Sequence, residues 1–545
     1  MHFSKKLISC SVIAVLMIGL IFQGHSYEKS KEEQIEQIVD STETVRLWYS
    51  DDSLTDYFTN AAVAFHEKNP EIRVIPVLVD SSEYLDNIYN QSILGEDFPD
   101  VYIASNDSLE KAYLSGIASE IQQKDAVNVK HFSQAAIDAV TYKKQLIGYP
   151  LFFETSVLAY NRTYLERWAD AVNSGEATAD EGKLSEEDLK EALGDVEESA
   201  EISAESEEEK VPVTADNYIP KNIDELLAFS DAYNAPDTVT GIFRWDVTDV
   251  FYNYFFVGNY LNVGGPTGDD TENIDIYNAN AISCLEVYQA LNQFFSIDAE
   301  NSSYKAALDD FTSGKSVFTV VTSDAVKTIR EAQKEALDKF KEADELAREE
   351  AKHRTQIEQN EAMGAKVEAS QDDDSKEAES DKASDDKKEE SSDDMKEDEP
   401  TELQKAADEL KTKVFDMEFA RIPMVSKDLD AKSLSVTNAL LVNGFSKHMA
   451  AANKFAEFAT TGYCASLYQK SGKIAASLDA DYEDEDLKIF QSEYANSIPL
   501  PKMMEAGNFW VQLEVLFTKV WRGEDIQPLL VNLSDQIANQ KVEEE

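Results

Sequence analysis

The sequence predicts an α/β protein with more than one domain, and three observations support this prediction. The chain has 545 residues, whereas a single domain usually has about 100–200. Strand and helix patterns alternate through residues 44–104, which is typical of a mostly parallel sheet. Two acidic segments with few large apolar residues, 176–210 and 367–400, interrupt the pattern. We therefore expect α/β domains that carry insertions.

The alternation is clearest near the start of the chain. Residues 54–68 carry apolar side chains at helical spacing. The same region contains three predicted strands, at 44–49, 72–79 and 98–103. A second predicted helix lies at 84–94. Elements that follow one another in this order predict parallel strands joined by helical crossovers.

The segments after residue 320 predict a helical insertion and then a return to the α/β body. Residues 324–363 and 401–414 are rich in Ala, Glu, Lys and Arg, so we expect a helical hairpin joined by an acidic linker. Beyond the insertion, strands are expected at 415–422 and 439–442. Helices are expected at 447–460 and 509–521. The domains are therefore expected to be discontinuous, with at least three crossovers between them.

The charge of the chain excludes two classes of partner. The formal net charge is −56. Residues 176–210 contain 15 Asp and Glu against 3 Lys, and residues 367–400 contain 16 against 5. Nucleic acid and anionic membrane surfaces repel such a chain, so we expect neither as a partner. Both acidic segments are expected to be solvated rather than packed.

The N-terminus has the layout of a secretory signal peptide at residues 1–26. Lys5 and Lys6 precede a sixteen-residue apolar run at 7–22. The run is shorter than the roughly 20 residues of a membrane span, which favours removal over retention as an N-terminal anchor. We therefore expect an exported protein, extracellular, on the cell surface or periplasmic, with an uncleaved N-terminal segment as the alternative.

The sequence gives no indication of a cofactor or a metal site. It contains six His, and no zinc motif, phosphate loop or nucleophile elbow is recognisable. Cys284 and Cys464 lie far apart and outside any cysteine framework. Two buried free thiols are therefore expected, with a long-range disulfide as the alternative.

Residues 135–164 are the most informative part of the sequence. Tyr149 and Pro150 lead into an apolar run that encloses one carboxylate, Glu154. Burying an unpaired carboxylate costs several kcal/mol, so the fold is expected to give Glu154 a ligand, a cation or water.

The same segment resembles the first crossover between lobes in the maltose-binding protein family of solute-binding proteins, where the pattern is DAV-Y-GKL--YP---E---L-YN--L. Further motifs follow in that family's order and spacing, at 65–74 (F----P-I-V), 98–101 (-PDV), 220–226 (P-TWDEL), 311–315 (F--GK) and 447–460 (K--AA--F--F-T). The resemblance runs with gaps from about Thr44 to Gln540. It implies a two-lobed, periplasmic-binding-protein-like α/β fold with discontinuous lobes, plus a helical and acidic insertion.

The resemblance also implies domain boundaries. Lobe 1 is expected at 43–153 and 438–488, and lobe 2 at 154–437 and 489–545. Within lobe 2 we expect two insertions, an acidic one at 176–210 and a helical or unstructured one at 330–413.

Ligand-binding residues are implied only where positions match the family. Three carboxylates and one aromatic residue match in this way and are expected to line the site: Glu154, Asp107, Asp52 and Trp510. Glu154 matches the crossover carboxylate that meets sugar hydroxyls, and Trp510 matches a stacking tryptophan. A sugar presents a C–H face to an aromatic ring and hydroxyls to carboxylates, so these residue types suit a sugar.

Three positions depart from the family pattern. Ala104 and Asp324 stand where aromatic residues are common, and Ser108 stands where a basic residue is common. The loss of two aromatic platforms argues against maltodextrin as the ligand and is compatible with an altered or weakened pocket. Trp245, Tyr252 and Tyr254 are candidates to restore aromatic surface, and Trp245 is therefore expected to be a ligand-binding residue as well.

Each site residue also has a structural alternative. Glu154 would then pair with a structural cation such as Arg162. Both candidate tryptophans would be packed in the core, and both aspartates would be helix N-caps, since each precedes a predicted helix.

Together these observations predict a receptor that captures a carbohydrate, in particular an oligosaccharide, between two lobes. It would deliver this ligand to the membrane permease subunits of an ABC importer, and we expect a monomer. Closure of two lobes around a ligand needs no chemistry, so no enzymatic activity is expected. The alternative is a cell-surface scaffold or adaptor on the same fold, with a vestigial pocket and residues 330–413 as its working part.

Overall fold

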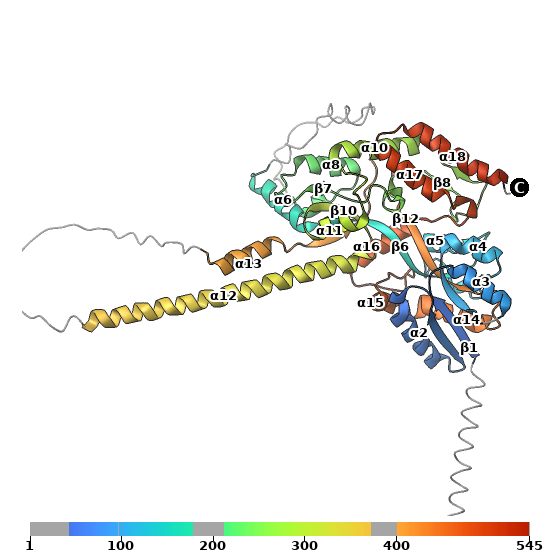
Figure 1. The fold of residues 1–545 in the computed structure, drawn as a ribbon, viewed down its shortest axis with the longest axis horizontal. Coiled ribbons are helices and arrows are strands. Elements are labelled where there is room, and N and C mark those ends of the chain that lie inside the picture. Colours follow the sequence, from blue (N-terminus) through green and yellow to red (C-terminus); the bar gives the residue numbers. More distant parts are fainter. Residues whose placement is uncertain (1–42, 96, 178–211, 372–399, 544–545) are drawn as a thin grey trace, which may run out of the picture. The chain divides into compact units, whose positions relative to one another are not determined.

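The computed structural model describes residues 43–95, 97–177, 212–371 and 400–543 of the chain (Figure 1). The predicted signal segment at 1–26 and nearly all of the two acidic segments lie outside these residues. By their contacts, the residues form two compact units. The first unit comprises Met1–Ser156, Asn253–Glu286 and Leu429–Glu545, and the second comprises Val157–Tyr252 and Val287–Asp428. Both units are therefore discontinuous, as expected.

The first unit is built on a mixed sheet in the order β2-β1-β3-β12-β6. Its strands are β1 (Glu43–Tyr49), β2 (Ile72–Leu78), β3 (Val101–Ser105), β12 (Leu434–Val442) and the first part of β6 (Gly148–Asn161). Strand β1 is parallel to β2 and β3, whereas β12 runs antiparallel to β3 and β6. The predicted parallel alternation is confirmed at the start of the chain, and a returning strand from its last third completes the sheet.

Helices α2 (Thr55–Lys68) and α3 (Tyr84–Leu94) are the crossovers that the sequence predicts between these parallel strands (Figure 1). Helix α2 buries its apolar face, and Phe65 meets Phe455 edge to face at 5.4 Å between ring centroids. The other elements that lie wholly in the first unit are α4 (Leu109–Leu114), α5 (Gln134–Ala139), β4 (Thr141–Tyr142), β5 (Gln145–Leu146), β8 (Asn262–Val263), β9 (Ile274–Asp275), α14 (Met449–Glu457), α15 (Leu467–Ser471), α16 (Glu485–Asn496), β13 (Ile498–Pro499), α17 (Phe509–Trp521) and α18 (Ile526–Glu543). The C-terminal segment 489–545, assigned to lobe 2 from the sequence, makes its contacts in this unit.

The second unit has a smaller sheet around the second part of β6. Strand β10 (Ser316–Thr322), every residue of which is buried, pairs in parallel with β7 (Gly241–Phe243), and β11 (Met417–Ala420) is antiparallel to β6. Helices α6 (Arg162–Ser174), α8 (Ile223–Ala232) and α11 (Tyr304–Thr312) also belong to this unit. Helices α9 (Val250–Asn253) and α10 (Ala279–Phe295) contain the points where the chain passes from one unit to the other.

The predicted helical hairpin is present in the second unit as α12 (Ala325–Gln371) and α13 (Glu402–Thr412), which pack against each other (Figure 1). Small residues allow the contact, because Ala347 and Ala407 are 2% and 1% exposed. Helix α12 has 47 residues and is therefore about 70 Å long. Ion pairs one turn apart support its polar surface, for example Glu335 with Lys339 at 2.7 Å.

Two further observations concern the described residues as a whole. Cys284 and Cys464 are buried free thiols, as expected, and burial raises the pKa of Cys284 to about 12. Among the residues that the structure describes, no helix combines the length and the apolarity needed to cross a membrane.

Candidate functional site

The predicted carboxylates Asp52 and Asp107 follow the ends of two neighbouring parallel strands of the first unit. Strand β1 ends at Tyr49 and β3 ends at Ser105, and parallel strands bring their carboxyl ends to one edge of a sheet. A cavity of about 400 Å³ lies at this edge. Its lining is rich in hydroxyl and amide groups and includes Ser50, Tyr84, Ala104, Ser105, Ser108 and Asn438. Two positions that depart from the family pattern, Ala104 and Ser108, therefore line this cavity.

Both aspartates are exposed, and neither is a helix N-cap. The cap of the short helix at Asp52–Leu54 is Asp51, whose carboxylate accepts a hydrogen bond from the Ser53 backbone N–H at 3.0 Å. Asp107 lies inside the next short helix, Asn106–Ser108, and its carboxylate accepts a hydrogen bond from the Ser105 hydroxyl. The capping alternative is wrong for both residues because each helix begins earlier than the sequence suggests. Their exposed oxygens are accessible to a ligand.

Strand β12 connects this cavity to Glu154. Asn438 lies opposite Ser105 of β3 on one side and opposite Phe152 of β6 on the other. Opposed residues on neighbouring strands present their side chains to the same face, and Glu154 follows Phe152 on that face after one intervening residue. Thirteen of the fourteen residues of β6 are buried, and Glu154 is the exception.

Glu154 is paired with Lys473. The Lys473 Nζ atom lies 3.2 Å from Oε1 of Glu154 and 3.4 Å from Oδ2 of Asp51, and it sits 5.3 Å from the ring centroid of Phe152. Burial alone would lower the pKa of Lys473, but the charges of Glu154 and Asp51 outweigh it and raise that pKa. The predicted need of Glu154 for a cation is met by a residue that the sequence did not single out.

The suggested structural partner of Glu154, Arg162, pairs elsewhere. In the second unit it makes ion pairs with Glu166, Asp216 and Glu418 at 3.0, 3.1 and 3.0 Å. Lys473 lies 319 positions from Glu154 in the sequence and stands among small and apolar residues. No local pattern marks such a pair, because the fold alone brings the two residues together.

The two candidate tryptophans differ in exposure. Trp510, on α17, is half-buried and lies against Tyr254 and Phe509, with ring centroids at 5.6 and 5.0 Å. Trp245 is 1% exposed and stacks on Phe243 at 4.2 Å in the second unit. The structure therefore places Trp245 in the core of its unit, which is the structural alternative, while Trp510 keeps part of its ring accessible.

The other candidate aromatic residues and Asp324 are packed as well. Tyr254 is 1% exposed, and Tyr252 is 8% exposed and stacks on Tyr304 at 4.6 Å. The Asp324 carboxylate accepts hydrogen bonds from Tyr304, at 3.2 Å, and from Thr322. Neither tyrosine therefore replaces the missing aromatic platforms as an exposed surface.

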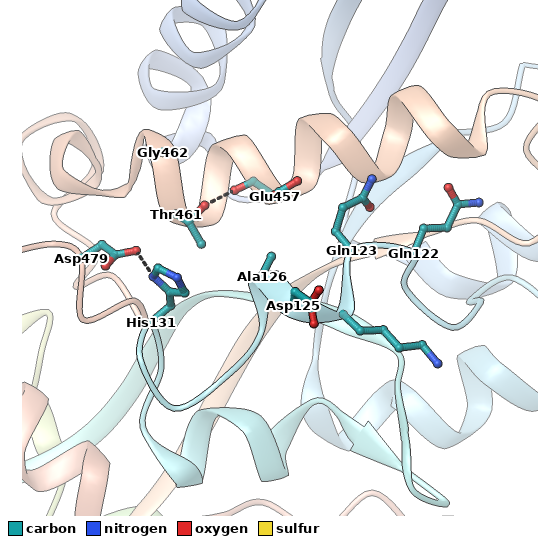
Figure 2. A pocket seen from close by; sticks show the side chains of 10 residues that line it. Gln122, Gln123, Asp125, Ala126, His131, Glu457, Thr461, Gly462 and Asp479 are labelled. Carbon is teal, nitrogen blue, oxygen red and sulfur yellow. Dashed lines mark hydrogen bonds and ion pairs between the residues drawn. The ribbon is translucent and has the colours of Figure 1, made fainter.

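The first unit has a second cavity, of about 660 Å³, which the sequence did not predict (Figure 2). Its lining is polar and charged: Gln122, Gln123, Lys124, Asp125, Ala126, His131, Glu457, Thr461, Gly462 and Asp479. His131 Nδ1 lies 2.7 Å from Asp479 Oδ2, and one wall includes the π-helical turn Phe458–Gly462. The two cavities have no lining residue in common, and no predicted site residue faces the second. Within the described part of the chain, no group of three or more His, Cys, Asp or Glu side chains is placed to hold a metal ion.

The two discontinuous units and the polar cavity at the carboxyl ends of the strands define a two-lobed solute-binding protein. A family model described as bacterial extracellular solute-binding protein matches residues 51–461. The chain therefore belongs to the family of bacterial extracellular solute-binding proteins. The predicted family, the predicted fold class and the predicted role as a solute-binding protein are confirmed.

Solved structures support the fold. An extracellular solute-binding protein from Staphylococcus aureus in complex with maltose is 15% identical, with a TM-score of 0.60, 92% of this chain covered and 98% of that chain. A cyclo/maltodextrin-binding protein complexed with maltotetraose is 16% identical, with a TM-score of 0.60 and coverages of 92% and 97%. A maltose-binding periplasmic protein from Listeria monocytogenes in complex with maltose is 16% identical, with a TM-score of 0.57 and coverages of 93% and 99%. A search of curated proteins gave no match.

Proposed function

We propose that this protein captures a carbohydrate, in particular an oligosaccharide, and delivers it to the permease subunits of an ABC importer. One observation carries the proposal. Asp52 and Asp107 follow the ends of the neighbouring strands β1 and β3, beside a cavity with many hydroxyl groups in its lining. Glu154 lies on β6, which β12 joins to β3, and its side chain shares a sheet face with Asn438 of the cavity lining.

The chemistry of this arrangement suits a polyhydroxylated ligand. Each ionised carboxylate accepts several hydrogen bonds, and sugar hydroxyls are donors that can use them without a change of charge. Trp510 offers a partly accessible aromatic ring for a sugar face. The similar solved structures named above hold maltose or maltotetraose, which supports a sugar as the ligand class.

Membership in an extracellular family supports export of the mature chain. We propose that the protein acts as a monomer, without catalysis, and outside the cytoplasm. Small side chains at Ala104 and Ser108 in the cavity wall favour a ligand other than a long maltodextrin, because they provide no stacking surface.

Thermal unfolding of the full chain against a panel of mono- and oligosaccharides tests the proposal. A ligand that binds only the folded state stabilises it by about 2.7 kcal/mol at a hundredfold excess over its dissociation constant. We expect one sugar class to raise the melting temperature. We also expect Glu154→Ala to remove most of this shift, since hydrogen bonds to a charged group are worth roughly 1.5–3 kcal/mol. Trp510→Ala should reduce the shift as well, because it removes the aromatic ring on which a sugar face would pack.

Glu166→Ala is the matched control, because Glu166 is also an ion-paired carboxylate but lies on α6 of the second unit. It should leave the shift unchanged. If no sugar in a broad panel raises the melting temperature, the carbohydrate proposal is refuted. The scaffold alternative, in which the α12–α13 hairpin binds a partner, would then be the better explanation.

A further inference from the structure

Asn438 is a polar residue in the middle of strand β12. The strand reads LSVTNALLV, and asparagine is depleted in strands because its side chain competes with the backbone ladder for hydrogen bonds. The neighbouring Thr437 has a structural role, since its buried hydroxyl shares a hydrogen bond of 2.7 Å with the Tyr494 hydroxyl. The Asn438 side chain forms no hydrogen bond within the described part of the chain. The residue is half-buried and lines the cavity of about 400 Å³ at the strand ends, so its amide is available to a ligand.

The backbone beside Asn438 is held against the short helix that carries Asp107. The Thr437 N–H donates to Asn106 Oδ1 at 2.9 Å, and the fully buried Asn106 opens that helix. Asn438 itself lies opposite Ser105, whose hydroxyl donates to the Asp107 carboxylate. The amide of Asn438 therefore has a fixed place close to one of the predicted carboxylates.

On the other side of Asn438, strand β6 contains a β-bulge. Asn438 lies opposite Phe152, whereas Ala439 lies opposite Pro150, so Leu151 has no partner on β12. A bulge bends a strand and redirects the side chains beside it, and bulges are over-represented next to active sites. The irregularity of the sheet therefore falls at the β12 residue that lines the cavity.

The carboxylates of the site suit only part of a sugar. When they are ionised, Asp52, Asp107 and Glu154 can only accept hydrogen bonds, so they match the hydroxyl hydrogens of the ligand. The ring and glycosidic oxygens of a sugar carry no hydrogen and need a donor from the protein. A primary amide supplies two N–H donors without adding a charge.

Four other side-chain donors in the cavity wall already have partners. They are the hydroxyls of Tyr84, Ser105 and Ser108 and the ammonium of Lys111. The tyrosine donates to the Trp48 carbonyl at 2.9 Å, both serines donate to Asp107, and Lys111 pairs with Asp86 at 2.8 Å. Asn438 is thus a neutral donor in the wall that the fold of the described residues does not use.

We propose that Asn438 is a ligand-binding and specificity-determining residue: its amide N–H donates to a sugar oxygen that carries no hydrogen, in the ring or in a glycosidic link. The inference rests on the proposed carbohydrate function and adds to it a residue that recognises the acceptor oxygens of the ligand.

Calorimetric titration of the full chain with maltotriose, cellotriose and xylotriose begins the test. For each trisaccharide that binds, two analogues follow, one with sulfur in place of the glycosidic oxygens and one with sulfur in place of the ring oxygens. Sulfur is a weak acceptor, so the wild type should bind one of the two analogues about tenfold more weakly than the parent sugar. The analogue that loses affinity identifies the oxygen that Asn438 binds.

Asn438→Leu and Asn438→Asp both remove the amide donor, and each should bind the parent sugar about tenfold more weakly. In both variants the same sulfur replacement should then change the affinity by less than about twofold, because the hydrogen bond is already lost. Asn60→Asp is the matched control, since Asn60 is an exposed asparagine on α2 of the same unit and lines neither cavity. It should keep the wild-type affinities. Circular dichroism checks that each variant is folded, and either Asn438 variant alone suffices for the comparison.

The outcomes separate this inference from the proposed function. If the wild type binds a trisaccharide and both of its analogues equally well, or if the sulfur effect persists in the Asn438 variants, the role of Asn438 is refuted while the carbohydrate function stands. A merely structural role would give the second of these results, because parent and analogues would weaken by the same factor. If no trisaccharide binds although another sugar raises the melting temperature, this inference is refuted, since each trisaccharide offers both kinds of oxygen. If no sugar of the melting panel binds either, the carbohydrate function is refuted and this inference with it.

Discussion

Two lysines in the first unit, Lys473 and Lys502, have different surroundings, and their pKa values shift in opposite directions. Lys473 lies partly exposed between two carboxylates, and their charges raise its pKa. Lys502 is 1% exposed, and its ammonium donates to two backbone carbonyls, that of Asp138 at 2.8 Å and that of Thr267. Burial lowers the pKa of Lys502 to about 8, although the charges of Asp269 and Asp138 act in the other direction.

The difference shows how partners and solvent decide what a lysine does. Lys502 connects segments that are distant in the sequence, because its backbone N–H also donates to the Gly268 carbonyl at 2.7 Å. A glycine is required at 268, where φ is +66° and a Cβ atom would lie 2.7 Å from the Cα of Pro501. Lys502 therefore lies in a buried contact that stabilises the fold. Lys473 instead lies in a partly exposed cluster of charged side chains that a ligand can reach.

The largest expected effect is on the alkaline stability that depends on Lys502. Its pKa is lower in the folded state than the usual pKa of a lysine side chain. Between about pH 8 and pH 10 the unfolded chain therefore binds more protons, and stability rises with pH. We expect the free energy of unfolding of the wild type to rise by about 2 kcal/mol more than that of Lys502→Met over this range. Urea unfolding at several pH values measures the difference. Tyrosine ionisation cancels in the comparison, because both proteins contain the same tyrosines.

A matched variant, Lys454→Met, removes an exposed lysine of the same unit and should follow the wild-type profile. If the free energies of unfolding of the wild type and Lys502→Met change equally with pH, Lys502 does not have the lowered pKa that its burial implies.

A smaller effect is expected at Lys473. Lys473→Met should lower the free energy of unfolding near neutral pH by no more than about 1 kcal/mol, because Asp51 is well exposed and solvent screens the pair. The pKa of Asp51 is depressed in the folded state, so its stabilising contribution is present above the unfolded pKa and is lost as the pH falls through the folded one. The difference between the wild type and Lys473→Met should therefore shrink in acid. A loss well above this size near neutral pH would show that Lys473, like Lys502, is mainly structural.

The smallest effect is expected from removal of the α12–α13 hairpin. Gln333 Nε2 lies 3.4 Å from Asp416 Oδ1, so a short Gly-Ser connection can replace residues 334–413. The hairpin is stabilised largely by its own helix contact and by local ion pairs. Sugar affinity and the pH profiles that depend on the two lysines should stay within about 0.5 kcal/mol of the wild type. Loss of sugar binding in the shortened protein would instead show that the hairpin contributes to the site.

Much of the fold could be predicted from the sequence. The helix expected at 84–94 is α3, the helix expected at 54–68 is α2, and the strand expected at 44–49 is β1. Each has a local cause, since the spacing of apolar residues follows the period of the element. The boundaries differ more: the strand expected at 439–442 is only the end of β12. The helix expected at 447–460 is α14, which ends at Glu457, followed by the π-helical turn Phe458–Gly462. Thr437 and Asn438 break the apolar run of β12, yet the strand continues because neighbours on both sides pair with it.

The site could be predicted in part. Glu154 was found from its position inside an apolar run, and Asp52 and Asp107 were implied by the resemblance to the family. The role of all three in binding a ligand stays a prediction. Trp245 was a candidate because it is aromatic, but aromatic side chains pack in cores as readily as they line sites. The domain boundaries, the state of the N-terminal segment and the monomeric state also stay predictions.

The sequence by itself determined the elements, the family resemblance and the unusual position of Glu154, because all of these depend on residues close together in the chain. Only the tertiary structure decided that Lys473 balances Glu154, that Lys502 is sealed by carbonyls, and that Trp245 is buried. Such contacts join residues up to several hundred positions apart. A local sequence pattern does not show which charged side chains the fold will bring together.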